Sequence, residues 1–172
     1  MSLTAGTGVR DISPAKPVFL VGYPHKERIS TGIHDPLLAS ALCLRNEETG
    51  IILIAVDILQ IDPRTARELR KTISGRTGLP ESHIFISCTH THSGPVTMDM
   101  IAWRDDPVVP EADVDYMKHF KNGIIEAAME AADSRRRVEI AWTAARAEGV
   151  GGNRLSPAGV TDPQVGILLA RD

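Results

Sequence analysis

The chain has 172 residues, and its hydrophobic fraction of 42% is high enough for a globular domain with its own core. Its formal net charge of -3 and its lack of a long basic run argue against nucleic acid as the main partner. No apolar run approaches the length of a transmembrane segment, so we expect one soluble domain over residues 1–172. The protein would be secreted or periplasmic if a signal peptide had been removed.

The first half of the chain predicts mainly strands. Residues 8–14 alternate apolar and polar side chains and predict a short strand. In the next apolar segment, residues 18–24, Gly22 marks a place where the backbone approaches a ligand or adopts a positive φ. Residues 37–45 and 51–58 are apolar runs joined by a polar, glycine-ended turn, which predicts an antiparallel hairpin.

A crossover unit follows the hairpin. Residues 51–57 are apolar at nearly every position, which is typical of a strand covered on both faces by helices. Asp57 ends this run, and its carboxylate either serves a pocket or forms a cap or turn before the next helix. Asp62 as the cap and Pro63 in the first turn predict the start of a helix. The helix is expected to continue to about Ser74, where Gly75 and Gly78 end it. We expect the next strand, residues 84–88, to be central in the sheet.

The second half predicts one long helix and two strands. Residues 96–111, which include Trp103, have no clear periodicity and are a candidate lid or substrate wall. A helix is predicted over 112–134, and strands over 138–147, with Trp142 packed, and over 165–170. The predicted buried stripe of the helix is Val114, Met117, Ile124, Ala128 and Ala131. The fold class is therefore α/β, with a mixed β-sheet carrying an antiparallel hairpin and flanking helices.

Cys43 and Cys88 each lie in an apolar segment, so we expect two small buried hydrophobic side chains rather than a disulfide. The glycines at 149, 151 and 152 match neither a phosphate-binding loop nor a dinucleotide fingerprint, which argues against a nucleotide site.

The segment of greatest chemical interest is residues 87–95, Ser-Cys-Thr-His-Thr-His-Ser-Gly-Pro, at the end of the 84–88 strand. On an extended backbone His90 and His92 share one face, so both imidazoles should reach one pocket, where nearby hydroxyls can fix their tautomers. Neutral imidazole is a common zinc ligand and also titrates near neutrality. Three interpretations of this histidine pair therefore remain: metal ligands, proton shuttles, or two half-exposed, hydrogen-bonded side chains without a chemical role.

Several motifs together resemble the N-terminal region of neutral/alkaline non-lysosomal ceramidases and their bacterial relatives. They are Gly22-Tyr23, the stretch 31–34 ending in His34, a strand ending in Asp57, the 89–95 string, and Asn153-Arg154. The resemblance implies a zinc-dependent amidohydrolase that cleaves an N-acyl bond of a small-molecule or lipid-like substrate.

The resemblance also implies roles for individual residues. His90 is similar to the first zinc ligand; His92 and Arg154 correspond to catalytic groups; Gly22, His34 and Asn153 correspond to substrate-binding groups. Family members complete the zinc site with a histidine, a glutamate and a tyrosine downstream of the matching region, so this chain resembles the incomplete front part of the catalytic domain.

Two other hypotheses remain. The chain could be a non-catalytic half domain that acts as a binding or assembly module, with a homo-oligomer placing His34 or Asp57 of another chain beside His90. Alternatively, His90, His92 and Asp57 could form a metal triad within this chain.

Overall fold

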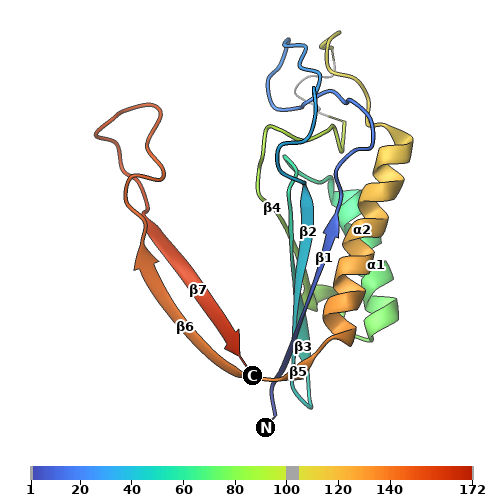
Figure 1. The fold of residues 1–172 in the computed structure, drawn as a ribbon, viewed down its shortest axis with the longest axis vertical. Helices are drawn as coiled ribbons and strands as arrows, with labels where there is room; N and C mark the ends of the chain where they lie inside the picture. Colours follow the sequence, from blue (N-terminus) through green and yellow to red (C-terminus); the bar gives the residue numbers. More distant parts are fainter. Residues whose placement is uncertain (1, 100–104, 172) are drawn as a thin grey trace. The chain divides into compact units, whose positions relative to one another are not determined.

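The computed structural model describes residues 2–99 and 105–171 and divides the chain into two compact units, Met1–Arg136 and Arg137–Asp172 (Figure 1). The first unit contains the two helices and most of a five-stranded sheet, whose strand order is β4-β3-β2-β1-β5. The strands of this sheet are β1 (Thr4–Asp11), β2 (Leu38–Arg45), β3 (Gly50–Val56), β4 (Ile84–Cys88) and β5 (Arg136–Arg137).

The sheet is mixed, as the sequence predicts. β1 pairs antiparallel with β2, and β2 with β3, whereas β3 and β4 are parallel. At the tip of the β2–β3 hairpin the Asn46 side chain accepts hydrogen bonds from the backbone N–H groups of Glu48 and Thr49. The α/β class and the hairpin are confirmed, but β4 lies at the edge of the sheet and not at its centre.

The crossover helix between the parallel strands is α1 (Pro63–Thr77). Asp62 caps it by accepting hydrogen bonds from the N–H groups of Arg64 and Thr65, with Pro63 in the first turn. Gly78 ends the helix in the left-handed conformation, at φ 72°. The predicted start is confirmed, and the helix runs three residues beyond Ser74 because Gly75 is accommodated inside it.

The second helix, α2 (Val114–Asp133), begins at Asp113, whose side chain accepts from the N–H of Tyr116. Its buried face is formed by Tyr116, Phe120, Gly123, Ile124, Ala127, Ala128, Ala131 and Ala132. The prediction that Val114 lies on that face was wrong, because this residue is 82% exposed. Val114 precedes Tyr116 by two residues, roughly 200° around the helix, so it points away from the sheet.

Glycines on β1 set the distance between α2 and the sheet. A Cβ at Gly8 would overlap the carbonyl oxygen of Ala127, and one at Gly6 would overlap that of Ala131. The absence of side chains at these positions therefore lets α2 lie directly against β1. Small residues on both sides make this contact close-packed.

Both helices cover the same face of the sheet, so the prediction that β3 is covered by helices on both faces was wrong (Figure 1). Ile52, Ile54 and Val56 face the helices and are buried, whereas Ala55 is exposed. Phe85 on β4 is 55% exposed for the same reason. Burial alternates along these strands because side chains in a strand point to opposite faces.

The second unit is a two-stranded antiparallel ribbon of β6 (Glu139–Arg146) and β7 (Gln164–Arg171). The predicted packing of Trp142 was wrong, because this residue is 81% exposed. A two-stranded ribbon lacks a second layer of its own on which such a ring could pack.

Cys43 is buried, Cys88 is half-buried, and both are free thiols. Burial raises the pKa of each thiol. Among the described helices, neither combines the length and the apolar character needed to cross a membrane.

Candidate functional site

The two histidines of the 87–95 segment lie in the turn after β4. Strand β4 ends at Cys88, but the backbone N–H groups of Thr89 and His90 still donate to the carbonyl oxygens of Val56 and Ile58. His90 then adopts φ 61°, in the left-handed region. The rings of His90 and His92 lie 5.3 Å apart between centroids, at an interplanar angle of 64°. The two rings lie close together, as expected, but a turn and not an extended backbone brings them there, and their convergence on one pocket stays a prediction.

The His90 ring is oriented by the main chain. Its Nδ1 lies 3.0 Å from the carbonyl oxygen of Leu59, a group that can only accept a hydrogen bond. Nδ1 therefore carries the proton in the neutral ring, and the Nε2 lone pair stays available. A backbone carbonyl, and not one of the neighbouring hydroxyls as expected from the sequence, sets this tautomer. This is the arrangement in which a histidine binds a metal through Nε2.

The His92 ring lies against the backbone of Gly22. Gly22 has φ 129°, and an ideal Cβ there would lie 2.5 Å from both Cγ and Nδ1 of His92. The predicted positive φ at Gly22 is confirmed, and the group that lies against its backbone is the His92 side chain. The Tyr23 ring meets His92 edge-on, with centroids 5.1 Å apart at 75°.

Sequence reasoning missed Arg28, which also contacts this cluster. Its Nη1 donates to the His92 carbonyl oxygen at 2.9 Å, and its guanidinium lies 4.7 Å from the centroid of the Tyr23 ring. One arginine in a polar loop carries no local signal for a contact with a residue 64 positions away.

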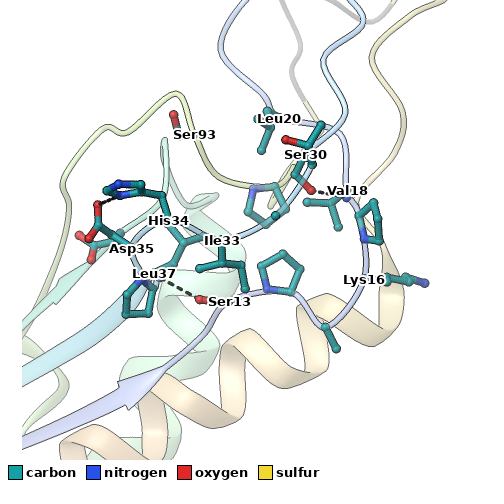
Figure 2. Close-up of a pocket in the computed structure, with 18 of the residues that line it drawn as sticks. Ser13, Lys16, Val18, Leu20, Ser30, Ile33, His34, Asp35, Leu37 and Ser93 are labelled. Atoms are coloured by element: carbon teal, nitrogen blue, oxygen red, sulfur yellow. Dashed lines mark hydrogen bonds and ion pairs between the residues drawn. The ribbon is translucent and has the colours of Figure 1, made fainter.

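A separate open cavity of about 760 Å³ lies beside the histidine turn (Figure 2). Thr91 and Ser93, which alternate with the two histidines, contribute to its wall, whereas the imidazoles do not. His34 also lines the cavity, and its Nδ1 lies 2.7 Å from the Asp35 carboxylate. Most of the remaining wall consists of residues 13–18 and 29–37. His34 thus lines the same cavity as Thr91 and Ser93, whereas His90 and His92 do not line it.

Asp57 belongs to the wall of the same cavity. Its Oδ2 accepts from the N–H of Leu38 at 3.0 Å, and its own N–H donates to the Leu38 carbonyl. Asp57 thus closes the β2–β3 pairing, which agrees with its interpretation as a turn residue. The cap of α1 is Asp62.

The hypothesis that His90, His92 and Asp57 form a metal-binding triad was wrong. Within residues 2–99 and 105–171, no group of three histidine, cysteine, aspartate or glutamate side chains is placed to hold a metal ion. A catalytic zinc takes three protein ligands and a water. The described residues therefore do not fit a complete zinc site, although the His90–His92 pair fits part of one.

Asn153 and Arg154 belong to the loop of the second unit. The Asn153 side chain accepts from the N–H groups of Leu155 and Ser156 and donates to the carbonyl of Val160. Asn153 therefore organises its own loop through contacts with residues that are close in the sequence. Arg154 is exposed.

The structure describes only part of the predicted lid, residues 96–111, because residues 100–104, which include Trp103, lie outside the described residues. In its described part, Thr97 is buried and donates to the carbonyl of Gln60. The buried Asp106 carboxylate accepts from the backbone N–H groups of His25 and Val108 and pairs with the His25 ring at 3.0 Å. This segment is therefore attached to the loop that carries Tyr23.

Comparison with known proteins places this geometry in context. The family model described as neutral/alkaline non-lysosomal ceramidase, N-terminal, matches residues 3–165. Two solved structures align with 100% of the chain at 18% identity: a ceramidase complexed with C2, with a TM-score of 0.85, and neutral ceramidase from Pseudomonas aeruginosa, with a TM-score of 0.82. The chain spans 29% and 30% of their respective lengths. No curated protein matches the sequence.

Proposed function

Since the chain belongs to the neutral/alkaline non-lysosomal ceramidase family, we propose that it forms the front part of the catalytic domain of a zinc-dependent amidohydrolase. The reaction is hydrolysis of an N-acyl amide bond in a lipid-like substrate. The observation that carries this proposal is the hydrogen bond from His90 Nδ1 to the Leu59 carbonyl, because it leaves Nε2 free beside the His92 ring.

His90 is the metal ligand in this proposal. One hydrogen bond holds its backbone and another holds its ring: the backbone N–H donates to the carbonyl of Ile58, and Nδ1 donates to the carbonyl of Leu59. Such a second hydrogen bond orients a histidine ligand and raises its basicity. The remaining zinc ligands come from outside this sequence, in line with the partial donor set of the described residues. Bound zinc polarises a carbonyl group and lowers the pKa of a coordinated water toward neutrality.

His92 is the second imidazole of the proposed site. Gly22 and Tyr23 restrict its ring, so it can present a nitrogen to the scissile amide in a fixed orientation. A ring held in this way donates to or accepts from a reacting group without first losing rotamer freedom. The Gly22 backbone contributes by its close approach. Arg154, as a cation, stabilises developing negative charge, and Asn153 binds substrate.

The cavity with His34 is proposed to hold another part of the substrate. Its wall combines apolar side chains, among them Ile33 and Leu37, with the polar groups of His34, Thr91 and Ser93 (Figure 2). A wall that combines apolar with polar and charged side chains suits an amphipathic ligand, whose hydroxyls His34 would contact.

The test is metal analysis and hydrolysis of N-acyl amides, ceramide included, by the full-length protein and by its His90→Asn variant. Asparagine tolerates the left-handed backbone and can donate to Leu59, but it lacks the imidazole Nε2. We expect zinc affinity to fall by at least about 100-fold and hydrolysis to be lost. His119→Asn, at an exposed position on α2, should match the parent protein in both measurements.

A full-length protein that contains His90 and His92 but binds no zinc and cleaves no amide would contradict the proposal. It would favour the alternative, a non-catalytic half domain acting in binding or assembly. An oligomerisation measurement would then separate a monomeric binding module from a homo-oligomer.

A further inference from the structure

We propose that Arg28, acting through Tyr23, is a positioning residue for His92. This inference rests on the proposed function, because that function gives His92 its catalytic role. The contacts that carry the inference are independent of zinc. Arg28 does not approach a reacting group in this view; it holds the residue that does.

The first contact fixes the His92 backbone. Arg28 Nη1 donates to the His92 carbonyl oxygen at 2.9 Å, and the interaction is partly buried. A hydrogen bond from a charged donor is stronger than one between neutral groups. Two residues later, the Gly94 carbonyl accepts from the N–H of Val21, so the turn is held on both sides of Ser93.

The second contact fixes the His92 side chain. The Arg28 guanidinium lies over the Tyr23 ring at 4.7 Å from its centroid, and Tyr23 meets His92 edge-on at 5.1 Å. A cation over an aromatic face is attractive and limits the rotation of the ring. Because Tyr23 is 49% exposed, the surrounding protein restrains its ring only in part. The guanidinium therefore restrains both the backbone of His92 and the ring beside it.

Arg28 itself comes from a well-defined backbone position. Its carbonyl accepts from the N–H of Leu20 at 2.7 Å, and Leu20 in turn forms a bridge with Pro95. The loop between residues 20 and 28 is thereby attached at both ends to the histidine turn. A lysine at position 28 keeps the charge but lacks the planar group that can stack on Tyr23 while donating to a carbonyl.

The first measurement is NMR of the zinc-free protein labelled with ¹⁵N at histidine, comparing Arg28→Met with Lys26→Met. Lys26 is an exposed cation of the same loop, so its variant controls for charge loss. We expect the His92 ring signals to shift and broaden in Arg28→Met and to stay unchanged in Lys26→Met. His83, whose ring contacts the Gly50 carbonyl, is the internal reference for an intact fold. Unchanged His92 signals in Arg28→Met would overturn the proposal.

The second measurement is steady-state hydrolysis by the full-length protein. Arg28→Met should lower kcat by about 10- to 100-fold and leave KM within about threefold, because misplacing a catalytic group affects the transition state more than binding. Arg28→Lys should recover part of this loss. A rise in KM alone, or equal effects of Lys26→Met, would overturn the positioning role.

The two proposals fail in different ways. A parent protein without zinc or hydrolysis contradicts the proposed function, while the NMR comparison still decides whether Arg28 orders His92. Where Arg28→Met does not fold, as shown by altered His83 signals, the same comparison is made with Tyr23→Leu and Tyr23→Phe. Only the leucine variant should disturb the His92 ring, and equal spectra of the two variants would overturn the role of Tyr23.

Discussion

Gly22 and His92 are so close that any Cβ at position 22 would lie 2.5 Å from Cγ and Nδ1 of the imidazole. The two residues are 70 positions apart, and the contact exists because Val21 pairs with Gly94. The backbone at Gly22 also has φ 129°, which side-chain-bearing residues rarely adopt.

Gly22→Ala should therefore destabilise the protein by about 1–3 kcal/mol, from backbone strain and from displacement of His92. Hydrolysis should fall with it. Gly32→Ala is the matched control, because a Cβ there meets no atom within 4 Å, and its effect should stay within about 1 kcal/mol. Urea unfolding measures both variants. Equal stabilities of the two variants would mean that the Gly22–His92 contact does not constrain the fold.

Asp57→Ala should leave zinc affinity unchanged, because the Asp57 carboxylate bonds to Leu38 and belongs to no metal-binding group among the described residues. Loss of this acceptor at the end of the β2–β3 pair should cost about 1–3 kcal/mol of stability, whereas Asp57→Asn, which keeps an oxygen acceptor, should cost less. Zinc titration and urea unfolding are the measurements. A loss of zinc binding in the alanine variant would show that Asp57 is a metal ligand.

Asp106 should make stability depend on pH. Burial alone raises the pKa of this carboxyl group, but hydrogen bonds from the N–H groups of Val108 and His25, together with the His25 ring, lower it below its ordinary value. A lowered pKa in the folded state means that this stabilisation is present above the unfolded value, about 3.9, and is lost as pH falls through the folded value.

We therefore expect the stability difference between the parent protein and Asp106→Asn to shrink as pH falls below about 4. Subtracting the two curves is necessary because Asp11, Asp62 and Asp113 also have lowered pKa values. Urea midpoints between neutral and acidic pH give the curves. A difference that stays constant over this range would show that the Asp106 carboxyl group has the same pKa in both states.

Tyr116→Phe should stabilise the protein. The Tyr116 hydroxyl is buried without a hydrogen-bond partner among the described residues, and burial raises the pKa of this side chain. Removing an unsatisfied hydroxyl while keeping the ring stacked on Phe120 should gain about 1 kcal/mol. Thermal unfolding is the measurement, with Tyr23→Phe, at a half-exposed ring, as the control expected to change little. A lower melting temperature for Tyr116→Phe would reveal a hydroxyl partner.

Local structure could be predicted from the sequence where a few neighbouring residues determine it. The start of α1 follows from Asp62 and Pro63, and its end follows from Gly78, because cap interactions span only a few positions. The bounds of β4 follow from its apolar run between polar segments. The positive φ at Gly22 could be predicted because glycine adopts it at little cost.

The burial of side chains and their contact partners could be predicted less well from the sequence. Alternation along β3 depends on which faces the helices cover, and an almost fully apolar run does not show that only one face is covered. Trp142 was expected to pack because large aromatic side chains usually do, but a two-stranded ribbon offers it no second layer.

The sequence by itself determined the fold class, the hairpin, the crossover helix and the presence of two imidazoles after a strand, because composition, periodicity and caps act over short distances. Only the tertiary structure decided that a left-handed turn at His90 brings the rings together, that Leu59 sets the His90 tautomer, and that Gly22, Tyr23 and Arg28 surround His92. These contacts join segments 31 to 70 residues apart, and their geometry arises only when the packed sheet brings the loops at its end together.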